Sequence, residues 1–252
     1  VVDRAEHAQA AGSQLGAMPL HQLCVCGLIQ QGHLPHPNTT VTIVFVLMVT
    51  HARPTVRETQ PGGREPAPGD LALVQSFLNS RWDLDRDEEE QLTSPDALAR
   101  WLGDHGLLGG GAGLREADLI RAREVREGLR ALLFANNGEP LDREAVEGLN
   151  RALGRLTFGV GFGADGAPGV VPRGQGLDGA LAAIASIVAV AQVDGTWSRL
   201  KACPGRQCGW AFYDHSRNRR GSWCTMSACG QRAKAREYRR RKRAPRASDL
   251  PR

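Results

Sequence analysis

The sequence lacks an apolar run long enough to cross a membrane. Its longest apolar stretches are Val41 to Val49 and Ala180 to Val193, and both are shorter than the about 20 residues that a helical span needs. No basic segment of the kind that opens a signal peptide precedes the first stretch, so we expect no such peptide. These absences predict a soluble cytoplasmic protein without a membrane partner.

Two further absences argue against a nucleotide-binding site and against disulfide bonds. The glycine-rich loop from Gly109 to Gly113 lacks the Lys and the Ser or Thr of a phosphate-binding loop, which argues against a nucleotide site. The six cysteines stand in no secretory context, and four of them form two evenly spaced pairs near the C-terminus. That pattern favours metal binding over disulfides. Cys24 and Cys26 form a C-x-C pair that could bind metal in principle, but we interpret them as two ordinary thiols.

The charge is distributed very unevenly, although the net charge is only +5. Residues 197–252 carry sixteen Lys and Arg against three acidic residues, a net charge of +13, which leaves −8 for the rest of the chain. A basic region of this kind favours polyanions, because each phosphate contact releases condensed counterions. Nucleic acid is therefore the first partner to consider, and we predict double-stranded DNA.

Residues 1–69 show no steady helical or strand period and end in a linker rich in Pro and Gly. We therefore expect a disordered leader. The sequence opens with Val1, and Met48 lies just before the Pro-rich stretch. An over-extended reading of the gene is a further interpretation of this segment.

Residues 70–195 predict a mainly helical domain with a small β-hairpin. The alternation of Phe158, Val160 and Phe162 before a turn indicates the hairpin, and the run from Leu177 to Val193 is apolar nearly all round, as expected of a central buried helix. We expect the Arg and Glu residues of the long helix to form its solvated face. The other predicted helices begin near Asp70, after the N-cap Ser94, at about Glu116 and after the N-cap Asp142.

Four cysteines predict one structural zinc ion. Cys203 and Cys208 form one C-x4-C pair, Cys224 and Cys229 form a second, and fifteen residues lie between the pairs. Zinc prefers four thiolates at the corners of a tetrahedron, and such a closed site supplies folding energy rather than catalysis. His215 could replace one sulfur, although four cysteines already satisfy the metal. We expect a small α+β zinc module of zinc-ribbon or treble-clef type over residues 197–243, followed by a flexible tail at 244–252.

A basic helix is predicted after the second cysteine pair, from Ser227 to Arg243, with a second basic patch before Trp223. Arginine suits bidentate contact with phosphate or guanine, and Gln231 could pair with adenine. A solvated basic tail is the alternative reading. The predicted DNA-binding residues are Arg217, Arg219, Arg220, Gln231, Arg232, Lys234, Arg236, Arg239, Arg240 and Arg243.

The segments from Cys203 to Arg219 and from Trp223 to Arg236 resemble the CGNR zinc-finger family of bacterial transcription regulators. The name-giving Cys-Gly-Asn-Arg stands here as Cys229-Gly-Gln-Arg232, which places the amide one methylene further out. Residues 71–194 resemble the ABATE domain that precedes this finger, described as a stress-induced regulator. The resemblance implies a nucleoid-associated regulator, and it implies a small-molecule effector for the helical domain as a conjecture.

Alternative functions remain at this point. Asp214, His215 and Asn218 within a four-cysteine frame are similar to zinc-framed HNH-type nucleases, but His215 is the only histidine after His105, so we predict no enzymatic activity. An RNA-binding or protein-interaction module is a further alternative. RNA and DNA both bind arginine-rich surfaces, so the sequence does not separate the two nucleic acids. A homodimer is also left open.

Overall fold

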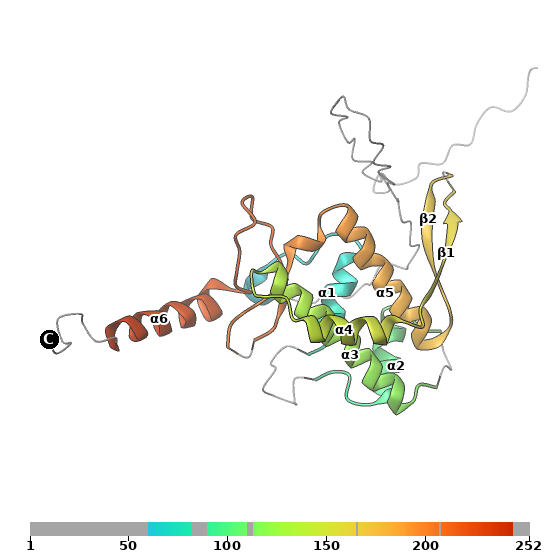
Figure 1. Cartoon of the computed structure of the whole chain (residues 1–252), viewed down its shortest axis with the longest axis horizontal. Helices are drawn as coiled ribbons and strands as arrows, with labels where there is room; N and C mark the ends of the chain where they lie inside the picture. Colours follow the sequence, from blue (N-terminus) through green and yellow to red (C-terminus); the bar gives the residue numbers. More distant parts are fainter. Residues whose placement is uncertain (1–59, 82–89, 110–112, 165, 207, 244–252) are drawn as a thin grey trace, which may run out of the picture. The chain divides into compact units, whose positions relative to one another are not determined.

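The computed structural model of the chain describes residues 60–81, 90–109, 113–164, 166–206 and 208–243. It confirms the predicted fold class: a mainly helical part with a β-hairpin precedes a small region that has a two-stranded sheet and a four-cysteine cluster. Figure 1 shows these elements in sequence colours. They are the 3-10 turn η1 (Pro61–Gly63), helices α1 (Leu71–Asn79), α2 (Pro95–Asp104), α3 (Glu116–Asn136) and α4 (Arg143–Leu153), strands β1 (Thr157–Phe162) and β2 (Pro168–Arg173), helix α5 (Gly176–Val193), the 3-10 turn η3 (Trp197–Arg199), strands β3 (Leu200–Ala202) and β4 (Ala211–Tyr213), the π-type turn η4 (Met226–Gly230) and helix α6 (Gln231–Arg243).

Some predictions fall outside the described residues. These are the leader as far as residue 59, with Cys24 and Cys26, and the tail at 244–252. Residues 60–69, which were predicted as the end of the leader, are described and include η1.

Local sequence signals set the helix starts as predicted. The Ser94 hydroxyl accepts a hydrogen bond from the Ala97 amide at 3.1 Å, and Pro95 fills the first turn of α2. The Asp142 carboxylate accepts from the Ala145 amide at 3.0 Å and caps α4. Both side chains satisfy amides that the first helical turn would leave without partners.

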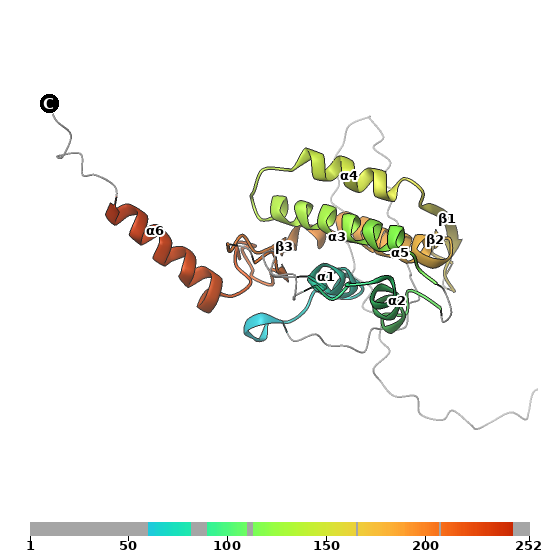
Figure 2. The same cartoon turned by 90° about the horizontal axis from the view of Figure 1, so that it is seen from below.

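Helix α5 is a core helix, as its all-round apolar sequence predicts. Leu181, Ile184 and Ile187 are buried in the main core. Figures 1 and 2 show α1, α3 and α5 packed together, with α4 along α3, in agreement with their contacts. Contrary to the expectation that no apolar run is long enough, α5 is long and apolar enough to cross a membrane. The core helix of a soluble protein can have the same length and composition, and half of this stretch is buried inside the protein.

The predicted hairpin is confirmed as the antiparallel pair β1–β2. Val160 pairs with Val170 and Phe162 with Pro168, which places these side chains on one face of the ribbon. Val160 is 63% and Phe162 75% exposed. The alternating pattern therefore gave the correct strands, although this apolar face is not covered by the rest of the described structure.

The predicted solvated face of α3 is wrong for three of its four arginines. Arg121, Arg126 and Arg130 are all buried, and Arg126 and Arg130 are among the largest fully buried side chains. Arg126 pairs with Glu90 and with Glu127. Burial of an arginine requires such partners; Glu127 is the neighbour of Arg126 on α3, whereas Glu90 comes from a segment 36 residues away.

The small sheet β3–β4 belongs to the same core as the helices. Leu200, Ala202, Ala211 and Tyr213 join the core cluster that α1, α3 and α5 form. Polar side chains of the helices also bind the sheet edges: the Asn79 amide nitrogen donates to the Ala211 carbonyl at 2.9 Å, and its carbonyl oxygen accepts from the Ala211 amide at 2.8 Å. The small sheet is therefore packed into the core of the helical part, whereas the four cysteines belong to a second cluster around Phe212.

Candidate metal centre and nucleic-acid interface

The four predicted cysteines come together in space. Their sulfurs all lie within 4.8 Å of one another, and the Cys224 sulfur lies 3.7 Å from those of both Cys208 and Cys229. A tetrahedron with zinc–sulfur bonds of about 2.3 Å has edges of about 3.8 Å, whereas a disulfide needs about 2.05 Å. The spacing and the all-thiol donor set therefore fit one structural zinc ion.

The crowded thiols strongly perturb one another. Hydrogen bonds from Cys208 and Cys224 lower the pKa of Cys203 to about 2. The hydrogen bond to Cys203 raises the pKa of Cys208 to about 12, and the same interaction raises the pKa of Cys224. Bound zinc would replace the shared protons and hold all four groups as thiolates.

Backbone turns bring the sulfurs into place. Cys203 follows β3 directly, and its amide donates to the Trp210 carbonyl at 2.9 Å. Gly205 closes the first turn, where an added Cβ would lie 2.8 Å from the Cys229 sulfur, so only glycine fits. On the other side, the Thr225 hydroxyl caps the η4 turn that carries Cys229. Each cysteine pair is thus held by a turn that its own local sequence specifies.

Aromatic side chains cover the cluster, and a segment before α1 crosses them. Phe212 is buried against the cysteines, with Trp210 and Trp223 packed around it. The Arg64 guanidinium lies 5.1 Å from the Phe212 ring centroid and donates to the Trp223 carbonyl at 3.0 Å. The Trp210 indole donates to the Gln60 side-chain oxygen at 3.2 Å. We call residues 60–67 the strap, because they tie the start of the helical part to the zinc module.

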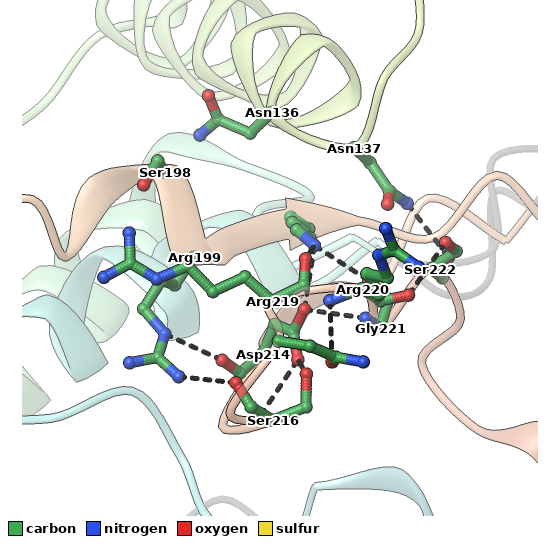
Figure 3. Close-up of polar contacts among 12 residues, drawn as sticks. Asn136, Asn137, Ser198, Arg199, Asp214, Ser216, Arg219, Arg220, Gly221 and Ser222 are labelled. Carbon is green, nitrogen blue, oxygen red and sulfur yellow. Dashed lines mark hydrogen bonds and ion pairs between the residues drawn. The ribbon is translucent and has the colours of Figure 1, made fainter.

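The first predicted basic patch lies on the loop of residues 216–221, here called the arch. Arg217, Arg219 and Arg220 are all exposed on it. The carboxylate of Asp214 is buried below the arch and pairs with Lys201 at 2.8 Å. Burial raises the pKa of Asp214, but hydrogen bonds from Lys201 and Ser216 outweigh that effect and lower it. Figure 3 shows the polar contacts that converge on Asp214 and the arch.

The second predicted patch lies on α6, which follows the last cysteine almost directly. Gln231, Arg232, Lys234, Arg236 and Arg239 are exposed. No other described element packs extensively on α6 apart from η4, which leads into it, and both overall views show it clear of the other helices (Figures 1 and 2). The side chains of Arg232, Lys234, Arg236 and Arg239 therefore face solvent.

One acidic residue interrupts the positive charge of α6. Glu237 binds Arg240 at 2.9 Å and Arg241 at 2.7 Å. Hydrogen bonds from Arg240 and Arg241 lower the pKa of Glu237, and the same contact raises the pKa of Arg240. Within the described part of the chain, no ion pair involves Arg232, Lys234, Arg236 or Arg239.

The geometry gives the nuclease alternative little support. The Asp214 carboxylate is fully engaged inside the protein. The His215 Nε2 atom lies 3.2 and 3.1 Å from the carbonyl oxygens of Glu65 and Pro66, and the Asn218 side-chain oxygen accepts from the Arg220 amide. Among the described residues, the four cysteines are the one group of His, Cys, Asp and Glu arranged to hold a metal.

Sequence reasoning missed the residues that position these patches. Lys201 lies on β3, and Asp214, thirteen residues later, directly follows the neighbouring strand β4. Asn137, the residue after α3, donates to the Ser222 carbonyl from 85 residues away. Their only sequence signal was a lysine inside one otherwise apolar strand and an aspartate directly after the next one.

Comparison with known families agrees with this architecture. A family described as "ABATE: Putative stress-induced transcription regulator" matches residues 69–194, and the CGNR zinc finger matches residues 199–242. No curated protein matches the chain. The first match covers half of the sequence and the second covers the cysteine cluster. The chain therefore belongs to the ABATE family of transcription regulators and carries a CGNR zinc finger.

Proposed function

We propose that this transcription regulator is a cytoplasmic, nucleoid-associated bacterial protein that binds double-stranded DNA through its zinc module, with the arch and α6 as the contact surface. The observation that carries the proposal is the exposure of two basic patches on either side of the second cysteine pair. Arg217, Arg219 and Arg220 precede Cys224, and the basic helix follows Cys229. A zinc ion held by all four cysteines would fix the two patches relative to each other.

The contacts proposed for α6 are largely electrostatic. The predicted contact residues of this helix are Gln231, Arg232, Lys234, Arg236, Arg239, Arg240 and Arg243. Arginine and lysine on an exposed helix neutralise phosphates, whereas base reading requires a well-fixed side chain. Arg232 lies three residues after Cys229, so it is the best candidate for reading a base edge.

Fluorescence anisotropy with labelled duplexes across a salt series tests this function. If about six cations meet phosphates, log affinity should fall with log salt at a slope of about −5, because each contact contributes about −0.9. Arg236→Ala should weaken binding to all sequences alike and flatten the slope by about 0.9. Arg232→Ala should instead reduce the preference for a selected sequence. DNA affinity that does not change with salt concentration, or that is unchanged by deletion of residues 231–252, would rule out α6 as the contact element.

The same assay with RNA tests the RNA-binding alternative, and a plasmid-cleavage assay tests the nuclease alternative. Binding to single-stranded RNA at least as tight as to duplex DNA would favour the RNA alternative. Metal-dependent cutting of plasmid by the wild type, but not by His215→Ala, would establish the nuclease alternative. We expect neither result.

The helical part is proposed to sense a small-molecule effector. A groove of 590 Å³ lies between α3 and α4, lined by Glu127, Arg130, Phe134 and Arg151 among others, and its volume is typical of ligand sites. Arg130 also donates a hydrogen bond to the carbonyl of Gly209, beside Cys208. A ligand in this groove that displaces Arg130 would therefore alter a contact with the zinc module. Thermal-shift screening of metabolites against wild type and Phe134→Ala tests the site.

Homodimer formation is proposed as well, because the apolar hairpin face carrying Val160 and Phe162 is exposed. Such a patch is typical of a protein-interaction surface, and a dimer would read two half-sites of a palindromic DNA site. Light scattering of wild type and Phe162→Ser decides between a dimer and a monomer.

A further inference from the structure

The arch is held from inside by one lysine. The Lys201 ammonium lies 2.8 Å from the Asp214 carboxylate, 2.7 Å from the Arg219 carbonyl and 3.0 Å from the Gly221 carbonyl. An ammonium has three donors, and all three are used here. The Lys201 side chain is 7% exposed, so it is not placed to meet a ligand itself.

Asp214 ties both ends of the arch to this lysine. One carboxylate oxygen accepts from the Ser216 amide at 3.1 Å and from the Ser216 hydroxyl at 2.6 Å. The other accepts from the Gly221 amide at 2.8 Å in addition to Lys201. An added Cβ at Gly221 would lie 2.8 Å from the carboxylate. The first and last residues of the arch thus meet on one buried side chain.

The arch is strained as well as tied. Arg219 has φ 54° and is the one non-glycine residue with positive φ in the part of the chain that the structure describes. Such a conformation is disfavoured for arginine and persists only where surrounding contacts over-determine it. The hydrogen bond from Lys201 to the Arg219 carbonyl is one of those contacts.

Two further side chains anchor the arch to the rest of the protein. The Arg199 guanidinium donates to the carbonyls of Asp214 and Ser216, each at 2.9 Å. The Asn137 amide, at the end of α3, donates to the Ser222 carbonyl at 2.9 Å. Figure 3 shows Arg199 and Asn137 reaching the loop from different elements.

We infer that Lys201 and Asp214 are positioning residues for nucleic-acid binding: they preorganise the arch so that Arg217, Arg219 and Arg220 meet neighbouring phosphates. This inference rests on the proposed DNA-binding function. Three nearby arginines on a mobile loop repel one another and lose freedom on binding, which weakens the complex. A loop that is already fixed in the free protein avoids most of that loss.

The test is a double-mutant cycle in DNA affinity. The tie-less variant is Lys201→Met/Asp214→Asn, which keeps the net charge of the wild type and leaves no buried charge without a partner. The arch variant replaces Arg217, Arg219 and Arg220 with Ala. The control replaces Arg236 and Arg239 on α6 with Ala. Each set is measured by anisotropy in the wild-type and tie-less backgrounds across a salt series, with zinc content and circular dichroism checked first.

In the wild-type background, the arch variant should flatten the salt slope by about 2.7, since three contacts contribute about 0.9 each. In the tie-less background it should flatten the slope by less than half as much, because the arginines are no longer held in place. The α6 control should flatten the slope by about 1.8 in both backgrounds. Additive effects of the ties and the arch would overturn the inference.

The remaining outcomes separate this inference from the proposed function. An arch variant that binds DNA like the wild type overturns the role of the arch and leaves binding by α6 intact. A wild type that binds no DNA overturns the proposed function and, with it, the positioning role. Should the tie-less protein fail to fold, Ser216→Ala removes only the 2.6 Å tie at an exposed residue, and its coupling to the arch variant should be smaller with the same sign.

Amide hydrogen exchange gives a readout that needs no DNA. In the tie-less variant, the amides of Ser216 and Gly221 should exchange at least about tenfold faster, while those of β3 and α3 stay protected. Unchanged protection of the arch would show that Lys201 and Asp214 do not fix it.

Discussion

Arg130→Met is predicted to loosen the zinc module from the helices without touching a cysteine. The Arg130 side chain is 2% exposed and pairs with Glu127 at 2.9 Å. It also donates to the carbonyls of Leu78 and Gly209, which are both buried contacts. Methionine keeps much of the length and removes every donor, so these acceptors lose a charged partner.

The magnitude follows from those lost contacts. Leaving a buried acceptor without its partner costs about 1–3 kcal/mol, and two such carbonyls together with the broken ion pair give about 3–5 kcal/mol. Glu127 retains Arg126 at 2.9 Å, which limits the loss. A change of this size is a large part of the about 5–15 kcal/mol that stabilises a typical domain.

Urea unfolding of the zinc-loaded protein measures the stability, and a chromogenic chelator under native conditions measures zinc release. The matched control is Arg126→Met, because Arg126 is equally buried on the same helix but binds Glu90 and Ser80 instead of the zinc module. We expect both variants to be destabilised and only Arg130→Met to release zinc clearly faster than its loss of stability explains. Should Arg130→Met lie within about 1 kcal/mol of the wild type, or release zinc no faster than Arg126→Met, the reasoning fails.

Three further predictions concern the metal, the strap and acid stability. Cys224→Ser should reduce the zinc content from about one ion per chain to near zero, and full retention by elemental analysis would contradict the ligand assignment. Arg64→Ala should lower the melting temperature and speed zinc release, because it removes the contacts with Phe212 and Trp223; unchanged release would show that the strap does not protect the site. Burial raises the pKa of Glu127, but Arg130 and Arg126 outweigh it and lower the pKa below 4.5, so this carboxylate stabilises the fold above that pH and loses its contribution as the pH falls through the folded-state pKa. Glu127→Gln should therefore differ most from the wild type near pH 7 and least near pH 3, and a difference independent of pH in urea unfolding would refute it.

The sequence by itself determined the features that local chemistry specifies. Ser94 and Asp142 cap helices through amides only three residues away, and the paired cysteines need only two short turns to present their sulfurs. The alternating Phe158, Val160 and Phe162 likewise specified a strand before any partner was known. In each case the information lies within a few residues of the chain, so the pattern could be read directly.

Only the tertiary structure decided which polar residues are buried and what they hold. Helical periodicity treats Arg130 as a surface residue, yet its acceptors come from Leu78, Arg81 and Gly209, as many as 79 residues away. The strap reaches the zinc module across about 150 residues. Lys201 and Asp214 form a pair only because β3 and β4 lie side by side. A charged side chain can be buried where distant segments supply its partners, and no local pattern records where those segments will meet.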